Sequence, residues 1–307
     1  MKKYIIFSHK YSDDSGGIIC LHYLAHLINR QGGVAYICPA FYNLEINKLA
    51  IKRPFLKALY GKYFDRFRNF KVNNNFENKI LADLESVKNN DDWIVIYPEI
   101  TFGNPLGAKH VIRWLLHNPG EHTGKIYYAS GELHVKYHHG FSDFHFPGAT
   151  LSENTLNISY FPLHLYNDYE VTSARSGTAY CLRKGRGRVL VHDVENSILI
   201  DGMSHEETAA VLRRVKTFIS YDLYTAYSVF AALCGCDSIV VPEEGVTKEK
   251  WFRLPEERYG VAYGFDDIDH MRDTRSLLIE RIQRDHLKNE ERVSAFINES
   301  QDFFNKS

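Results

Sequence analysis

The chain has 307 residues, with 37 lysines and arginines against 38 aspartates and glutamates, so its formal net charge is -1. A general nucleic-acid binder needs an excess of basic residues to displace counterions from phosphates, so this class is excluded. With 44% hydrophobic and 24% charged residues the composition is that of a globular protein, and the length favours two domains.

The N-terminus and the cysteines bear on the location of the protein. Two lysines are followed by an apolar run that is too short for a signal peptide, and no window has the length and apolarity of a transmembrane helix. The five cysteines are odd in number and irregularly spaced, which predicts free thiols in a reducing compartment. We therefore expect a cytoplasmic protein.

The first half of the chain alternates strand-like apolar runs with helical patterns. A strand at 3–8, a helix at 18–30 and a strand at 34–38 form a βαβ unit, which predicts a parallel sheet in an α/β, Rossmann-like domain over residues 1–165. Further along we expect helices at 78–88 and 107–120, strands at 91–100 and 125–130, and a loop over 131–160.

A second alternation of strands and helices begins near residue 166. It predicts a second Rossmann-like domain over 166–285, followed by a C-terminal helix over 286–307. Ser204 and Glu207 have the spacing of a capping box at the start of one helix. Strands are expected at 178–185, 197–201, 217–222 and 237–245, and helices at 204–214, 223–235 and 267–305.

The loop after the first strand holds two acids and two glycines, at Asp13, Asp14, Gly16 and Gly17. Parallel sheets bind ligands at the carboxyl ends of their strands, where a helix N-terminus also offers free N–H groups to an anion. A carboxylate in this loop is a candidate general base, and simple helix capping is the structural alternative. Glu99 ends another strand of the same sheet, so it is a further candidate.

Two segments of the second domain suit a diphosphate. Arg183 and Lys184 end its first strand, where cations can neutralise phosphates, although a solvated basic turn is the alternative. Small hydroxyls and the free amides of a helix N-terminus suit phosphate or ribose. The residues concerned are Ser220, Tyr221, Asp222, Thr225 and Ser228.

The sequence resembles the GT-B glycosyltransferases of bacterial polysaccharide (lipopolysaccharide and capsule) biosynthesis. The resemblance lies in SDDSGG (12–17), in 98–120, in LRKG (182–185), in the strand–helix–strand pattern of 218–245, and in 259–271. It implies two Rossmann-like domains that face each other across a cleft, a nucleotide-diphosphate sugar as donor, and no cofactor or essential metal.

The resemblance also implies roles for the candidate residues. Arg183 and Lys184 would hold the donor diphosphate. The chemistry of the transfer makes Asp14, with Asp13 and Glu99 behind it, the candidate to accept or orient the proton of the acceptor hydroxyl, whereas a reaction that retains configuration without a covalent intermediate needs no dedicated base. Gly16, Gly17 and the 220–228 set complete the candidate donor site. The Glu-x7-Glu pair of many such enzymes is missing, which leaves Asp222, Tyr221 and Thr225 as substitutes at the donor ribose.

The segment from Lys48 to Lys71 differs in composition from the rest of the chain. It holds eight basic residues and one acid, with six aromatic residues among them. Such a segment either lies on an anionic membrane surface, near a lipid-linked acceptor, or forms a solvated helix with aromatic packing. The first reading predicts a peripheral protein of the inner face of the cell membrane.

Two other functions fit the same architecture. One is a nucleotide-sugar 2-epimerase, which would need no lipid-linked acceptor. The other is a non-catalytic protein that binds a sugar nucleotide or a glycan, against which the acids at 13 and 14 argue. The histidines at 134, 138, 139 and 145 match no zinc spacing, so no metal site is predicted.

Overall fold

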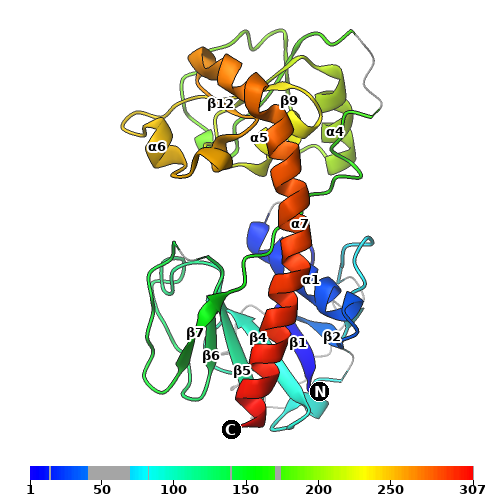
Figure 1. The fold of residues 1–307 in the computed structure, drawn as a ribbon, viewed down its shortest axis with the longest axis vertical. Coiled ribbons are helices and arrows are strands. Elements are labelled where there is room, and N and C mark those ends of the chain that lie inside the picture. Colours follow the sequence, from blue (N-terminus) through cyan, green and yellow to red (C-terminus); the bar gives the residue numbers. More distant parts are fainter. Residues whose placement is uncertain (14, 41–69, 82, 139, 170–173, 307) are drawn as a thin grey trace, which may run out of the picture. The chain divides into compact units, whose positions relative to one another are not determined.

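The computed structural model describes the chain except for residues 14, 41–69, 82, 139, 170–173 and 307. It divides into two compact units. Unit 1 comprises Met1–Tyr160 together with His286–Ser307, and unit 2 comprises Phe161–Asp285. Each unit is an α/β structure built on its own parallel sheet (Figure 1).

Unit 1 contains a seven-stranded sheet in the order β3-β2-β1-β4-β5-β6-β7, and all neighbouring strands are parallel. The central strands β1 and β4 are buried and apolar, as expected for a parallel sheet that is covered on both faces. The strands are β1 (Lys3–Ser8), β2 (Ala35–Pro39), β3 (Lys79–Ile80), β4 (Trp93–Pro98), β5 (His110–Leu115), β6 (Leu133–Lys136) and β7 (Thr150–Thr155).

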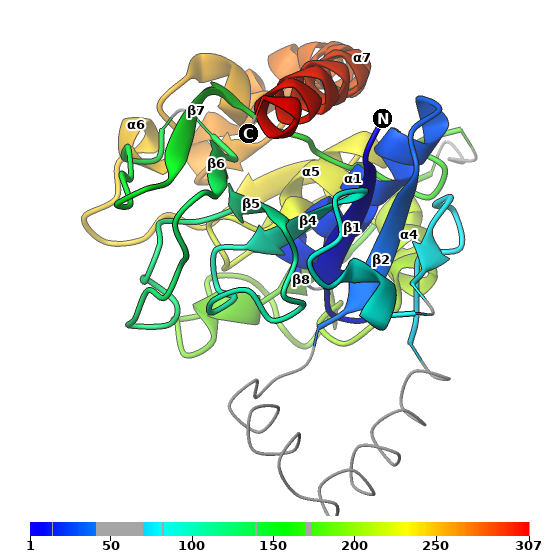
Figure 2. The same ribbon diagram turned by 90° about the horizontal axis from the view of Figure 1, so that it is seen from below.

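The two faces of this sheet are covered differently. Tyr4 and Ile6 of β1 cluster with α1 (Gly16–Arg30) and with the C-terminal part of α7 (Ile268–Asn305), which runs along one face (Figure 2). The alternate side chains, Ile5 and Phe7, cluster with the loops that connect β3 to β4 and β4 to β5. The predicted βαβ unit over 3–38 is confirmed, and among the described residues both of the α-helices that pack on this sheet, α1 and α7, lie on the face of Tyr4 and Ile6.

The predicted helix over 107–120 is wrong, because this segment contains strand β5. All six residues of β5 are buried, including the charged Arg113. A short apolar run inside a two-sided sheet cannot be distinguished from a buried helix by periodicity alone, and this ambiguity misled the prediction.

The neighbouring predictions also need correction. Residues 125–130 form no strand, and the region 131–160, expected to be a loop, supplies β6 and β7. Strand β6 is only four residues long and half polar, so its sequence carries little strand signal. The expected helix over 78–88 consists instead of β3 and one short 3-10 helix, η2 (Glu85–Val87).

Unit 2 contains a five-stranded parallel sheet in the order β12-β11-β10-β8-β9. The predicted strands and helices of this unit are present, although most are shorter than expected, and the capping box of Ser204 and Glu207 is confirmed. The strands are β8 (Thr178–Cys181), β9 (Ser197–Leu199), β10 (Thr217–Ser220), β11 (Asp237–Val240) and β12 (Ala262–Tyr263), and the helices are α4 (His205–Arg214), α5 (Ala226–Leu233) and α6 (Lys248–Trp251).

The core of unit 2 lies mainly on one face of its sheet. There Ala179 of β8 and Phe218 of β10 cluster with residues of α4, α5 and the N-terminal part of α7. Small side chains such as Ala231 keep α5 close to the strands. Three short 3-10 helices, η3 (Arg183–Gly185), η4 (Pro255–Arg258) and η5 (Phe265–Asp267), follow strands or loops, and all five cysteines of the chain are free thiols.

Candidate functional site

The N-terminus of α1 lies where β1 ends in unit 1, and two glycines form its first turn. Ser15 caps the helix, since its hydroxyl accepts from the backbone N–H of Ile18 (3.5 Å). A methyl group added at Gly16 would meet nothing, and at Gly17 it would meet only Leu116 Cδ1, at an ordinary 3.6 Å. Neither glycine has a positive φ. The described fold therefore does not require glycine here, although glycine in a helix costs up to about 1 kcal/mol relative to alanine.

The loop before α1 holds two acids, Asp13 and Asp14. Asp14 lies outside the described residues. Asp13 is exposed and lies near Tyr11, whose hydroxyl pKa is raised by burial and also by the Asp13 carboxylate. The candidate base Asp13 thus has a phenol beside it.

Glu99 directly follows β4, and its carboxylate is buried. Its Oε2 accepts from the backbone N–H of Leu116 (3.1 Å), and its backbone carbonyl accepts from the Tyr128 hydroxyl (2.7 Å). Burial raises the pKa of Glu99 to about 7. Because the side chain of Leu116 also lies against Gly17, the structure brings Glu99 close to the start of α1. A carboxyl group that titrates near neutral pH is suited to general acid–base chemistry.

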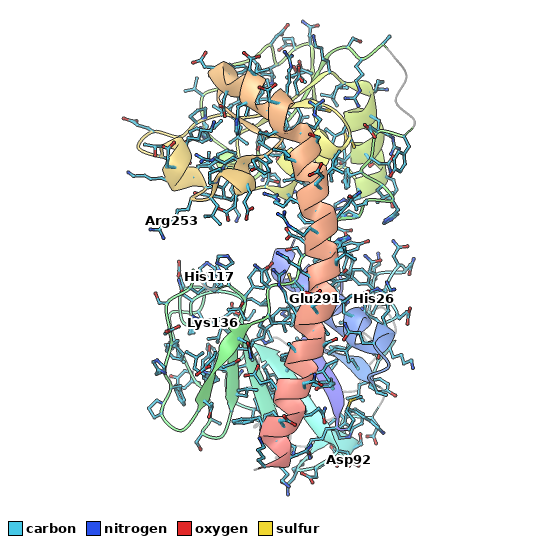
Figure 3. The ribbon with its side chains drawn as sticks, viewed as in Figure 1. His26, Asp92, His117, Lys136, Arg253 and Glu291 are labelled. Carbon is cyan, nitrogen blue, oxygen red and sulfur yellow. The ribbon has the colours of Figure 1, made fainter. Side chains whose placement is uncertain are left out.

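The histidines of unit 1 were candidates for a metal site. His134 is buried beside Glu132, with Nε2 and Oε2 3.2 Å apart, and His139 lies outside the described residues. Among the residues that the structure describes, no group of three or more His, Cys, Asp or Glu side chains is placed to hold a metal ion. Figure 3 shows His117, which follows β5, at the opposite end of unit 1 from Asp92, which precedes β4.

In unit 2, the basic turn after β8 is held tightly at the carboxyl end of the sheet. The Asp201 carboxylate accepts from the backbone N–H groups of Leu182 (3.1 Å) and Arg183 (2.8 Å). Arg183 has a φ of 43°, a left-handed conformation that few non-glycine residues adopt. A methyl group at Gly185 would lie 2.1 Å from the Tyr221 carbonyl oxygen, so this glycine is required by the fold.

The same turn contacts the first turn of α5. The Arg183 guanidinium lies over the Tyr227 ring, 5.0 Å from its centroid. Thr225 is the N-cap of α5, since its hydroxyl accepts from the Tyr227 backbone N–H (3.3 Å). Lys184 is exposed and forms no ion pair within the described part of the chain, while Arg186 lies 3.7 Å from Asp201. The structure therefore brings the basic turn and the start of α5 together.

Ser220 ends β10 at this edge and residues 221–222 follow it, and their polar groups form hydrogen bonds within unit 2. The Ser220 hydroxyl donates to the Asp222 carbonyl (2.7 Å), and Asp222 Oδ1 accepts from the Tyr224 backbone N–H (3.1 Å). The Tyr221 hydroxyl accepts from the backbone N–H of Val191 (2.7 Å). These contacts fix the edge but leave the side chains of Ser220 and Tyr221 buried.

Ser228 lies farther along α5 and is buried. Its backbone carbonyl accepts from the Ser238 hydroxyl of β11 (2.8 Å), so this turn of α5 faces the sheet. Of the predicted donor residues, the structure thus brings Arg183, Lys184 and Thr225 together near the surface and places Ser228 inside the unit. Their roles in donor binding stay predictions.

Arg188 is a residue of this edge that the sequence analysis missed. Its guanidinium donates to the carbonyl oxygens of Tyr221 (2.6 Å), Val241 (3.0 Å) and Pro242. It therefore caps the carboxyl ends of β10 and β11 and adds a positive charge there. Arg188 follows Gly185 of the basic turn by three residues, but nothing in the sequence indicates its partners, because they are distant along the chain.

Comparison with known proteins gives little further information. No protein-family model matches the chain, and no curated protein matches it. Among solved structures, T4 phage BGT in complex with its UDP-glucose substrate is similar over 100% of this chain and 98% of its own, with 10% sequence identity and a TM-score of 0.38.

Proposed function

We propose that this protein is a GT-B glycosyltransferase that moves a sugar from a nucleotide-diphosphate donor to a glycan or glycolipid acceptor in cell-surface polysaccharide assembly. The observation that carries the proposal is the contact between the basic turn at Arg183–Gly185 and the first turn of α5, at the carboxyl end of a parallel sheet. Cations and free helix amides together suit a diphosphate.

The chemistry of glycosyl transfer explains why such a site is needed. The reaction breaks the bond between the anomeric carbon and the donor diphosphate, so negative charge grows on the leaving phosphate. Preorganised cations and helix dipoles stabilise this charge without reorganisation during the reaction. Lys184, which is exposed, would contact the diphosphate, while Arg188 keeps the nearby strand ends positive.

The acceptor hydroxyl must lose a proton as the new bond forms. Asp14, Asp13 and Glu99 are the candidates. Glu99 is supported by its raised pKa and by Leu116, which donates to its carboxylate and lies against Gly17 of α1. We propose that the group which titrates near pH 7 accepts or orients this proton. No metal ion and no cofactor are part of the proposed reaction.

The proposed location is the cytoplasm, at the inner face of the cell membrane. The basic and aromatic segment 48–71 would contact anionic lipid, but its residues up to 69 lie outside the described ones. Within the described residues, no helix combines the length and apolarity needed to cross a bilayer. Co-sedimentation with vesicles should therefore increase with their content of anionic lipid, and binding independent of that content would contradict the membrane proposal.

A thermal-shift panel tests the donor site. UDP, GDP, CMP and dTDP are added in turn, and we expect one of them to raise the melting temperature, because a ligand that binds only the folded state stabilises it. Lys184→Ala should weaken this shift. Lys216→Ala is the matched control, since Lys216 is also exposed but precedes β10, at the amino end of the sheet.

Incubation with the corresponding nucleotide sugars then separates the functions. Donor hydrolysis or transfer to an added glycan supports the transferase, an epimerised sugar nucleotide supports the epimerase, and binding without turnover supports the non-catalytic protein. If no nucleotide shifts the melting temperature, the proposed donor site is wrong.

A further inference from the structure

Unit 1 contains a buried ion pair, Arg113 and Glu132, that takes no direct part in the proposed transfer. Arg113 lies within β5 and is fully buried, and Glu132 precedes β6 with 1% of its surface exposed. The pair is bidentate: Arg113 Nε donates to Glu132 Oε2 (3.0 Å) and Nη2 donates to Oε1 (2.7 Å). Replacing such a pair with apolar residues is often neutral or stabilising, so stability alone does not explain it.

The remaining bonds of Arg113 go to the segment that follows Glu99. Nη1 donates to the Thr101 carbonyl (2.8 Å), and Nη2 donates to the Gly103 carbonyl (2.9 Å). The guanidinium also lies over the ring of Tyr128, 4.4 Å from its centroid. The planar fork thus holds loop 99–103 from the neighbouring strand.

Tyr128 extends this support to Glu99 itself. Its hydroxyl donates to the Glu99 carbonyl (2.7 Å), while the Glu99 carboxylate accepts from the Leu116 N–H (3.1 Å), just after β5. Among the described residues, the charged or titratable groups that face Glu99 are Arg113 from β5 and Tyr128 from the loop before β6, with Glu132 behind Arg113. The positive charge of Arg113 opposes the effect of burial on the Glu99 pKa.

We propose that Arg113 is a positioning residue for Glu99. Arg113 holds the backbone of loop 99–103, and thereby keeps the Glu99 carboxylate beside the start of α1. The proposal rests on the proposed function in so far as Glu99 takes part in transfer. The Glu132 carboxylate fixes the orientation of the guanidinium, since it also accepts from the Ala129 backbone N–H (3.0 Å).

The test compares Arg113→Lys with Arg175→Lys in the full chain. Lysine keeps the charge but not the fork. Arg175 is the matched control, because it too donates to backbone carbonyls, those of Leu212, Arg213 and Cys234, but in unit 2. We expect R113K to lower kcat by about 10- to 100-fold, as misplaced catalytic groups do, and R175K to leave it near the wild-type value.

A second measurement does not depend on activity. The titration of the Glu99 carboxyl carbon is followed by 13C NMR in the substrate-free protein and assigned with E99Q. In R113K the midpoint of the Glu99 titration should move to higher pH, because the lysine ammonium does not hold its charge where the guanidinium did. In R175K the midpoint should stay at the wild-type value. If the wild type transfers no sugar but this shift is seen, the proposed function fails and the positioning role stands.

Tyr128→Phe decides the case if R113K does not fold. It keeps every charge and removes only the hydroxyl that holds the Glu99 carbonyl. We expect a lower kcat with an unchanged KM for the donor. The proposal is overturned if folded R113K matches R175K in both kcat and the Glu99 titration, or if Y128F matches the wild type.

Discussion

The carboxyl ends of the two sheets are built from the same kind of element but carry opposite chemistry. In unit 1 the strand ends present a buried carboxylic acid, Glu99, beside a helix that starts with two glycines. In unit 2 they present cations, with Arg183 and Lys184 on a turn beside a helix that is capped by Thr225. In the proposed function the edge of a parallel sheet provides the place in both units, and the loop residues decide between proton transfer and anion binding.

The largest expected effect concerns the acid in unit 1. Glu99→Gln keeps the size and the Leu116 contact but removes the base, so kcat should fall by about 100-fold or more, as for other general bases. Below pH 7, kcat/KM of the wild type should fall with decreasing pH, because Glu99, whose pKa is about 7, takes up a proton there. Kinetics across pH 5–9 measure both.

Asp14→Asn is the competing variant. If it lowers kcat with the fold intact while E99Q remains active, the base is Asp14. The acid of unit 1 that contrasts with the cations of unit 2 then lies in the loop before α1 and not after β4. Full activity of D14N, conversely, removes Asp14 from the catalytic role.

The next effect concerns the cations of unit 2. Lys184→Ala should raise the donor KM and lower kcat together, by about 10-fold each, since a charge-assisted contact to the leaving phosphate is worth about 1.5–3 kcal/mol. Steady-state kinetics with the donor identified by the thermal-shift panel provide the measurement, and K216A is the control. Unchanged kinetics would remove Lys184 from the site.

The stability of the protein should also depend on pH through Glu99. The folded protein binds this proton up to about pH 7, whereas the unfolded chain releases it near 4.5, so the folded state gains stability at low pH. This contribution, about 3 kcal/mol, is complete below pH 4.5 and is lost as the pH rises to 7. Denaturant unfolding of wild type and E99Q at pH 5 and pH 8 should show that only the wild type loses this amount.

The smallest expected effect concerns the glycines of unit 1. Gly16→Ala meets open space, so it should stabilise the fold by about 0.5–1 kcal/mol through the better helix propensity of alanine. If a ligand approaches the start of α1, the same change should weaken its binding. Paired measurement of the melting temperature with and without nucleotide sugar and acceptor separates the two effects, and unweakened binding would mean that the glycines serve no ligand.

Unit 2 could be predicted from the sequence much better than unit 1. Its strands and helices alternate with clear periodicity, and local signals such as the capping box at Ser204 mark their ends. In unit 1, such signals mark the βαβ segment at the start and the strand predicted at 91–100, which is β4. Strand β5 looked helical because it is buried on both faces, and β6 is short and polar.

The same contrast applies to the candidate site. The basic turn and Glu99 were found because charges at strand ends stand out in a sequence. The roles of Arg188 and Arg113 could not be predicted, because their partners are backbone carbonyls distant in sequence, such as Val241 and Gly103. Only the folded arrangement shows such contacts.

Helix α7 has a consequence for how the protein is made. Val293 and Phe296 of this helix complete the core over the sheet of unit 1, and Ser300 meets the Tyr4 hydroxyl at 2.7 Å. The ribosome therefore makes the strands of unit 1 first, then all of unit 2, and only afterwards the helix that covers those strands. The synthesis of unit 1 starts before that of unit 2 and ends after it. The apolar face of its sheet therefore stays uncovered by α7 while Phe161–Asp285 is synthesised, a period of roughly 6 to 25 seconds at typical translation rates.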